Sequence, residues 1–263
     1  MDHIAVGRYW DDNADVWTRL AREGYDVYRD HVNTPAFLEM LPPVKGLSGL
    51  DIGCGEGENT RRLARLGACM TAIDISEKFV RHAATVAASE PQAIRYVRAS
   101  AVQLPFGDGA FDFATAFMSL MDIPENEAAL AEARRVVRPG GFFQFSITHP
   151  CTDTPHRRNL RDARGETYAI EVGRYFDRED GHVETWSFSA APADLRAALR
   201  PFRVPRFHRT LASWLNSVVD AGWTLERVAE PLASEEVARR SPHVRDTRVA
   251  PYFLDVRCRR PRV

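Results

Sequence analysis

Apolar runs alternate with helical periods between residues 47 and 148, and this alternation predicts the architecture of that part of the chain. Runs of strand length precede stretches in which apolar side chains recur at three- and four-residue spacing. The predicted strands are Leu47–Gly53, Ala68–Asp74, Ala93–Arg98, Phe111–Met118 and Phe142–Thr148. Helices are predicted over Glu58–Leu66, after the capping residue Ser76, and from Pro124 to the stop signal Arg138-Pro-Gly-Gly. Such alternation predicts a parallel sheet with helices on both faces.

The flanking segments extend this α/β pattern. Residues 1–44 read as one or two amphipathic helices rich in aromatic side chains and ended by Pro42–Pro43, and residues 45–150 as the core. Residues 151–209 do not show this alternation of strand and helix patterns, and we predict that they form an insertion over the sheet edge. The alternation resumes in residues 210–263, where we predict a helix ending at Gly222 and two strands, Trp223–Ala229 and Tyr252–Cys258. We therefore expect one domain over residues 1–263, with a seven-stranded, mostly parallel sheet.

Composition narrows the function classes. The 263 residues are 44% hydrophobic and 27% charged, with a net charge of −1, so no basic excess indicates a nucleic-acid partner. No apolar stretch approaches the ~20 residues of a membrane span, so we expect a soluble, cytoplasmic protein with no membrane partner. The four cysteines form no Cys-x-x-Cys pair, so no metal site is expected. The expected assembly is a monomer or a homodimer.

The sharpest motif is the run LDIGCGEG at residues 50–57, a strand leading into a glycine turn and a helix. Glycines allow the backbone to approach a ligand closely. A dinucleotide fingerprint would need glycine where Glu58 stands, and the Gly-Lys-Ser/Thr of a P-loop is absent. The acids Asp51, Glu56 and Glu58 favour a cationic ligand over a pyrophosphate. Asp74, at the end of the next strand, is suited to bind the two hydroxyls of a ribose.

These residues resemble the class I S-adenosylmethionine-dependent methyltransferases, in particular the small-molecule type 11 branch. The matching runs are LDIGCGEG at 50–57, AIDIS at 72–76, LPFGDGAFD at 104–112 and AEARRVVRPGGFF at 131–143. The resemblance implies a Rossmann-like fold and S-adenosylmethionine as cofactor, with S-adenosylhomocysteine as product.

The resemblance also implies roles for individual positions. Gly53, Cys54 and Gly55, next to Asp51, would line the methionine part of the cofactor. Asp74 would hold the ribose. The residues expected around the adenine are Ile75, Ser100, Ala101 and Val102, and those expected near the sulfonium are Phe117 and Met118. Ser100 departs from the family, which often has an aspartate there to accept from the adenine amino group.

The catalytic candidates are two histidines. His149 follows the fifth predicted strand, and His208 precedes the late helix; either is suited to act as a base or to orient an acceptor hydroxyl. Each has the alternative interpretation of a histidine that bonds loop backbone. Cys151 is interpreted as an ordinary thiol. The fourth strand ends in Phe117-Met-Ser-Leu and not in Asn/Asp-Pro-Pro-aromatic, which argues against methylation of a nucleic-acid amino group.

Two peripheral segments are predicted to enclose a small-molecule acceptor. Tyr9 and Trp17, on the N-terminal segment, would close over the cofactor as a lid. The insertion 151–209 would roof the acceptor pocket, with His149 at its mouth and Tyr175 or Trp186 facing inward. We expect in-line methyl transfer to a small molecule. The alternative is a non-catalytic protein that binds S-adenosylmethionine, such as a sensor or a partner subunit.

Overall fold

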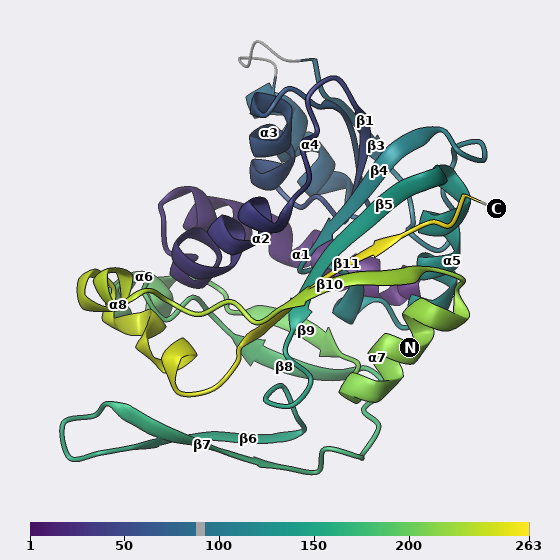
Figure 1. Cartoon of the computed structure of the whole chain (residues 1–263). Coiled ribbons are helices and arrows are strands. Elements are labelled where there is room, and N and C mark those ends of the chain that lie inside the picture. Colours follow the sequence, from purple (N-terminus) through teal and green to yellow (C-terminus); the bar gives the residue numbers. More distant parts are fainter. Residues whose placement is uncertain (88–92, 263) are drawn as a thin grey trace.

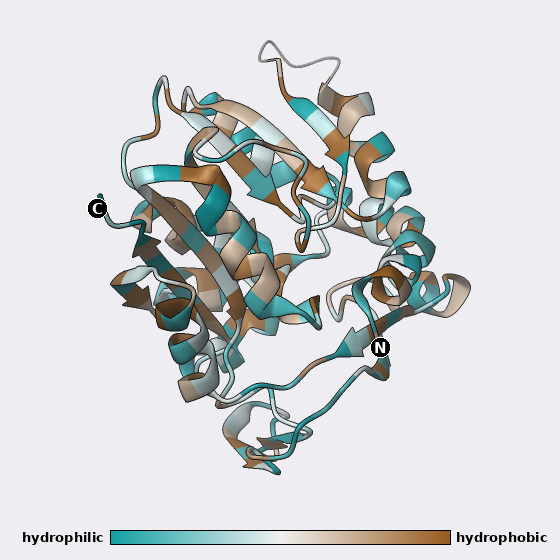
Figure 2. Cartoon of the chain, turned by 90° about the vertical axis from the view of Figure 1, so that its right-hand side faces the viewer, coloured by the Kyte–Doolittle hydropathy of each residue, from teal (hydrophilic) through white to brown (hydrophobic). Residues whose placement is uncertain are grey.

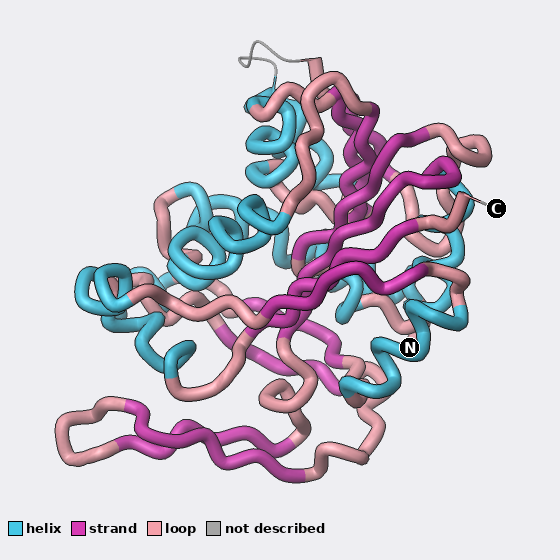
Figure 3. Tube along the Cα trace, viewed as in Figure 1, coloured by secondary structure: helices cyan, strands magenta, loops and turns pink. Residues whose placement is uncertain are grey.

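The computed structural model describes residues 1–87 and 93–262 of the chain. Its centre is a seven-stranded sheet in the order β10-β11-β5-β4-β1-β2-β3, seen in Figures 1 and 3. The strands are β1 Ser48–Ile52, β2 Cys69–Asp74, β3 Arg95–Arg98, β4 Phe111–Phe117, β5 Val137–Thr148, β10 Thr224–Ala229 and β11 Phe253–Arg259. The pairs among β1 to β5 are parallel, whereas β11 pairs antiparallel with both β5 and β10. The predicted mostly parallel, seven-stranded α/β fold is confirmed.

Helices cover both faces of the sheet. On one face, α5 (Asn126–Val136) and α7 (Leu211–Asp220) contribute Leu130 and Trp214 to a buried cluster with the central strands. On the other face, Leu63 of α3 (Glu58–Arg65) packs with Phe113 and other strand residues. Hydrophobic residues run along the central strands in Figure 2, because a sheet covered on both faces buries the side chains of both. The remaining helix of the core, α4 (Glu77–Ala87), begins after Ser76, whose Oγ accepts from the Phe79 N–H.

The boundary between α5 and β5 differs from the prediction. The helix begins at Asn126, two positions after Pro124, and ends at Val136. Strand β5 begins at once, so the Arg138-Pro-Gly-Gly run lies inside the strand instead of separating helix from strand. Gly140 adopts φ +80°, and Gly141 has the Asp112 carbonyl oxygen 2.4 Å from where a Cβ would lie. The two glycines therefore let this segment bend and pack closely while the strand continues.

The N-terminal residues form the predicted helical segment. Helix α1 (His3–Arg22) begins after Asp2, whose carboxylate accepts from the Ala5 N–H at 2.8 Å. A short π-helix, η1 (Arg29–Asn33), leads directly into α2 (Thr34–Met40). Helix α1 packs against α4 and against strand β9 of the insertion, so it bridges the core and the insertion.

The insertion is built from two hairpins that sequence periodicity did not reveal. Strands β6 (His156–Arg161) and β7 (Thr167–Gly173) pair antiparallel, as do β8 (His182–Trp186) and β9 (Phe202–Arg206), with the short helix α6 (Ala193–Ala198) between β8 and β9. Figure 1 shows both hairpins below the carboxyl ends of the parallel strands, with β6–β7 farthest from the sheet.

Between β10 and β11 the chain forms α8 (Glu235–Arg240) and the 3₁₀ segment η3 (Pro242–Arg248). Val244 of η3 packs with Val32 and Phe253, which brings this segment beside the N-terminal helices. None of the helices in the described ranges has the length and apolarity that a membrane crossing requires.

Candidate active site

The glycine turn after β1 is held against the end of β2 by its backbone. The N–H groups of Gly53 and Cys54 both donate to the Ile73 carbonyl oxygen at 2.9 Å. Gly53 has φ +72°, and a Cβ there would lie 2.4 Å from the Ser119 Cβ. Gly55 has φ +55°, yet no atom lies within 4 Å of where its Cβ would be. Gly53 is therefore required by packing, whereas Gly55 leaves space for a ligand to approach the backbone.

Asp74 fixes the geometry between this turn and the next helix. One carboxylate oxygen accepts from the Gly55 N–H at 2.9 Å and the other from the Ser76 N–H at 2.8 Å. Burial raises the pKa of Asp74 to about 6, against the lowering effect of the two backbone hydrogen bonds. Because each carboxylate oxygen can accept more than one hydrogen bond, both can still receive a donor from a ligand.

Asp51 is buried beneath the turn. Its two oxygens accept from the Thr60 hydroxyl at 2.5 Å and the Thr115 hydroxyl at 2.9 Å. Burial raises the pKa of this carboxyl, and the two hydroxyl hydrogen bonds oppose that shift. The hydrogen bonds connect β1, α3 and β4 directly below the glycine turn, so Asp51 both supports the turn and lines the space above it.

A cavity of about 140 Å³ lies beside Asp74. Of the residues predicted around a nucleoside, Asp74, Ile75, Ser100 and Ala101 line it. Val102 does not, and its N–H instead lies 3.4 Å from the Ser100 Oγ. Residues that the sequence reasoning did not assign also line this cavity, and they are His3, Val6, Trp10, Ile73, Phe79, Ala99, Ser119, Asp122 and Ile123.

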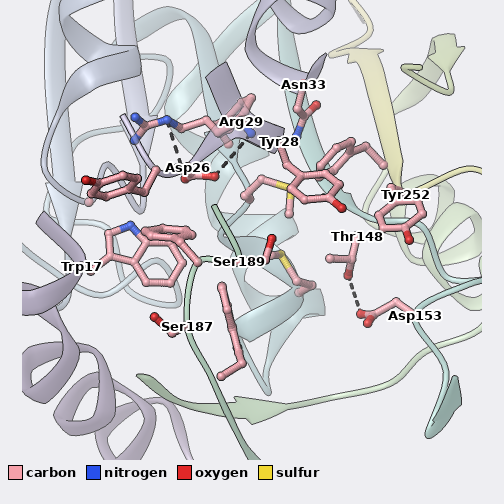
Figure 4. A pocket seen from close by; sticks show the side chains of 18 of the residues that line it. Trp17, Asp26, Tyr28, Arg29, Asn33, Thr148, Asp153, Ser187, Ser189 and Tyr252 are labelled. Atoms are coloured by element: carbon pink, nitrogen blue, oxygen red, sulfur yellow. Dashed lines mark hydrogen bonds and ion pairs between the residues drawn. The ribbon is translucent and has the colours of Figure 1, made fainter. Parts of the chain in front are cut away.

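A second cavity, of about 570 Å³, opens at the carboxyl ends of the parallel strands. Its lining includes the predicted Asp51, Gly53, Cys54, Gly55, Phe117, Met118, Trp17 and Trp186. Figure 4 shows side chains from the N-terminal helices, the core and the insertion converging on it. The two cavities adjoin, because Trp10, Trp17, Gly53, Gly55 and Met118 line both.

Trp17 joins the N-terminal helix to the insertion over this space. Its ring lies 5.5 Å from that of Trp186, 4.9 Å from Phe188 and 4.6 Å from Phe202, measured between centroids. Trp10 packs edge-on against Trp17 at 5.4 Å. Tyr9 lines neither cavity and instead lies under the Arg203 guanidinium, 5.0 Å from its ring centroid. On α1 the tryptophans, and not Tyr9, thus face the site.

Neither predicted catalytic histidine lines either of these two cavities. His149 is buried, with Nε2 2.9 Å from Glu230 Oε1 and Nδ1 accepting from the Cys151 N–H at 3.2 Å. Burial lowers the pKa of His149, although Glu230 acts in the opposite direction. The expectation that His149 stands at the mouth of the pocket is wrong, because both ring nitrogens are engaged in holding the loop after β5.

His208 is also engaged with backbone. Its ring nitrogens lie 2.9 Å from the Asp153 carbonyl oxygen and 2.7 Å from that of Tyr175. The Tyr175 hydroxyl in turn accepts from the Leu211 N–H at 2.8 Å, and Tyr175 does not line the large cavity. Of the two aromatic residues expected to face inward, Trp186 does so and Tyr175 does not.

One wall of the large cavity is a polar cluster that sequence analysis did not predict. The Tyr252 hydroxyl donates to Asp246 at 2.7 Å, the Tyr28 hydroxyl lies 2.9 Å from the same carboxylate, and the two tyrosine rings stack 5.6 Å apart. The Asn159 amide donates to Asp246 at 3.2 Å, and the Arg157 guanidinium lies 4.3 Å above the Tyr252 ring. These residues come from three segments far apart in the chain, so no local motif could have identified them.

On the opposite side, Asp26, which lies between the N-terminal helices, and the buried Glu56 of the glycine turn both pair with arginines. Burial raises the pKa of Asp26 to about 6, while Arg29 lowers it. Arg29 lies 3.7 Å from Asp26 and 3.6 Å from Glu56, which also pairs with Arg61 at 3.0 Å (Figure 4 shows the Asp26–Arg29 contact). Within the described ranges, no group of three or more His, Cys, Asp or Glu side chains is arranged to hold a metal ion.

Comparison with known proteins agrees with this geometry. Residues 50–145 match the family model of a methyltransferase domain. An O-methyltransferase of Penicillium expansum is 34% identical over 159 residues, which is 58% of this chain and 55% of that protein. The ubiquinone biosynthesis O-methyltransferase of Caulobacter vibrioides is 40% identical over 102 residues, 38% of this chain and 40% of that protein. The chain thus spans about half the length of these curated relatives.

Similarity to solved structures extends over more of the chain. An S-adenosylmethionine-dependent methyltransferase from Mesorhizobium loti has a TM-score of 0.70 and 28% identity, covering 86% of this chain and 96% of the other. The glycine turn and Asp74 fall within the residues that match the family model. Residues 50–145 thus form a methyltransferase domain of the type 11 family, and the chain as a whole is similar in structure to class I S-adenosylmethionine-dependent methyltransferases.

Proposed function

We propose that this protein transfers the methyl group of S-adenosylmethionine to a small-molecule acceptor by in-line displacement. The observation that carries the proposal is the pair of adjoining cavities that meet at Gly53, Gly55 and Met118. One cavity has the chemistry for a nucleoside and the other has room for a methionine tail and an acceptor. A reaction of this kind needs the two substrates held in line, and adjoining cavities supply that arrangement.

The residues fit the cofactor. The open space over Gly55 admits a ligand close to the backbone, and Asp74 presents two oxygens to the ribose hydroxyls. Ile75 and Ala101 supply apolar surface for the adenine, and the Ser100 hydroxyl is an acceptor for its amino group. The cofactor supplies an electrophilic methyl group. The chain's own contribution is to bind and orient both partners and to exclude water.

The acceptor side suits a planar, partly apolar molecule. Trp17, Trp186 and Phe188 form one wall of the large cavity, and Tyr28 and Tyr252 form another. Both curated relatives described above are named as O-methyltransferases, which favours a hydroxyl group as the methylated position. We propose that positioning and desolvation provide most of the rate. In this proposal, His149 and His208 are not catalytic and instead hold the loops of the insertion that covers the acceptor cavity.

Calorimetry and product analysis test the proposal together. S-adenosylhomocysteine is expected to bind with a clear heat signal, whereas NAD gives none; binding of NAD alone would overturn the assignment. With S-adenosylmethionine and a panel of phenolic and alicyclic hydroxyl compounds, mass spectrometry is expected to find a product heavier by one methylene. A non-catalytic binder would give the heat signal without any product. The large open cavity favours the enzyme.

A further inference from the structure

Asp122 is a buried carboxyl that nothing in the proposed chemistry has used. It is the last residue of the 3₁₀ segment η2 (Leu120–Asp122) and lines the smaller cavity together with Gly53 and Met118. The residue is 5% exposed. Within the described part of the chain, its carboxyl has no hydrogen bond, in contrast to Asp51 and Asp74 in the same site.

An unpartnered carboxylate in such a place is costly when charged. Burial raises the pKa of Asp122 to about 7, because the charged form loses its hydration without gaining donors. The charged groups that face it come from several elements. Arg206 of β9 and Arg209 before α7 favour the carboxylate, while Asp153 after β5 opposes it. His3 of α1 and Asp74 of β2 line the same cavity.

We propose that Asp122 is the counter-charge for the sulfonium of the cofactor, so that the site prefers cationic S-adenosylmethionine to its neutral product. This inference rests on the proposed function. Asp122 shares its cavity with Gly53, Gly55 and Met118, where the two cavities meet and where the proposed transfer takes place. A positive charge there compensates the carboxylate in a space from which water is excluded, where such attraction is strong.

The proposal predicts proton linkage with a definite sign. Below its pKa, Asp122 is protonated in the free protein and must release a proton to bind the sulfonium as a carboxylate. Affinity for S-adenosylmethionine therefore rises with pH through about 7, the value to which burial raises the pKa. Affinity for S-adenosylhomocysteine does not gain in this way, because the thioether carries no charge. The ratio of the two dissociation constants is expected to change by up to about tenfold between pH 6 and pH 8.

The test is calorimetry with both ligands on the full chain at pH 6, 7 and 8. Asp122→Asn keeps the shape of the side chain and removes its charge, and it is expected to flatten the pH dependence of the ratio. Asp255→Asn is the matched control. Asp255 is also buried, and burial likewise raises its pKa to about 7, but it is not among the described residues that line either cavity. This variant is expected to behave as the unmodified protein.

A second measurement does not depend on any variant folding. Titration of the unmodified protein at pH 6.5 in two buffers of different ionisation enthalpy should show more proton release for S-adenosylmethionine than for S-adenosylhomocysteine. Equal proton release, or a ratio whose pH dependence is the same with and without Asp122→Asn, overturns the inference while the proposed function stands. If neither ligand binds at any pH, the proposed function fails and the inference with it.

Discussion

The cofactor half and the acceptor half of the site are built in different ways. In the cofactor half, the important contacts are hydrogen bonds that backbone N–H groups of the glycine turn donate to the end of β2, from Gly53 to the Ile73 carbonyl oxygen and from Gly55 to the Asp74 carboxylate. In the acceptor half, they are side-chain contacts between segments far apart, such as Trp17 with Phe202 or Tyr28 with Asp246. The first kind of site is specified by a short motif, and the second arises only when distant segments pack together.

The two halves also manage buried charge differently. Asp51 and Asp74 keep their oxygens hydrogen-bonded to hydroxyls and backbone N–H groups of the core. Around the large cavity, two acids instead pair with arginines, Asp153 with Arg206 and Asp26 with Arg29, while Asp246 accepts from tyrosine hydroxyls and an amide. A cofactor common to a whole family can be bound by backbone geometry. Recognition of a particular acceptor depends on side chains, which can vary without disturbing the sheet.

The largest expected effect is on the free energy of unfolding, and it tests whether the core and the insertion fold together. Phe113 in the core and Phe202 in the insertion are both fully buried, at 0% and 1% exposed. Replacing either by alanine is expected to lower the free energy of unfolding by ~3–5 kcal/mol, because each leaves a cavity in a packed aromatic cluster. Urea unfolding followed by circular dichroism would measure both. Phe202→Leu, which keeps most of the volume, is the milder control. An unchanged main transition in Phe202→Ala would show that the insertion unfolds separately and that the chain is not one domain.

Substitutions of the two glycines of the turn should affect stability and cofactor binding to different extents. Gly53→Ala is expected to lower the free energy of unfolding by ~2–4 kcal/mol, because it combines a positive φ with a Cβ 2.4 Å from the Ser119 Cβ. Gly55→Ala adds only backbone strain of ~1–2 kcal/mol but fills the space left for the ligand. Thermal unfolding and calorimetry with S-adenosylhomocysteine should therefore rank the variants in opposite order. The same order in both measurements would mean that the space over Gly55 is not a ligand site.

Asp74 is expected to contribute to affinity more than to stability. Asp74→Ala should weaken binding of S-adenosylhomocysteine by ~1.5–3 kcal/mol, the range for hydrogen bonds to a charged group. The exposed Glu77→Ala, three residues on, is the control and should leave affinity within twofold. If the alanine variant at position 74 binds as tightly as the unmodified protein, the ribose is not held there.

The pH dependence of binding should reflect the same carboxyl. Burial raises the pKa of Asp74 to about 6, so the free site is protonated below that pH and loses acceptors for the ribose hydroxyls. For the free protein, a pKa above its unfolded value of ~3.9 means that stability from this group is present below pH 4 and is lost as the pH rises towards 6. Affinity for S-adenosylhomocysteine is expected to fall below pH 6, measured by calorimetry. Asp74→Asn should remove this dependence.

The smallest effect concerns the adenine end of the cofactor cavity. Ser100 stands where the family often has aspartate, and a hydroxyl is a weaker acceptor than a carboxylate. Ser100→Asp is expected to tighten S-adenosylhomocysteine binding by about threefold, and Ser100→Asn, which has similar size without the charge, by less. Fluorescence titration of the cavity tryptophans would measure both. Weaker binding of Ser100→Asp would indicate that the adenine amino group lies elsewhere.

The sequence by itself determined the cofactor half, because a strand, a glycine turn and an acid at the end of the next strand are each encoded within a few residues. Parallel neighbours then bring Gly55 and Asp74 to the same edge of the sheet without further information. The fourth strand and the two closing strands followed from the same periodicity, whereas the antiparallel direction of β11 did not. The α5–β5 boundary did not, since glycines at 140 and 141 permit a bend within a strand as well as an end to a helix.

Only the tertiary structure decided which side chains face the acceptor cavity. His149 and Tyr175 looked well placed because they follow core elements in sequence, but Glu230 and Leu211, distant in the chain, engage their polar groups elsewhere. Trp10 was not distinguishable from Tyr9 until α1 packed on the core. The hairpin strands β6, β7 and β8 have no fully buried position, so they lack the strong alternation that reveals a half-buried strand. Short-range hydrogen bonding is encoded locally, whereas side-chain packing depends on every segment that meets at the site.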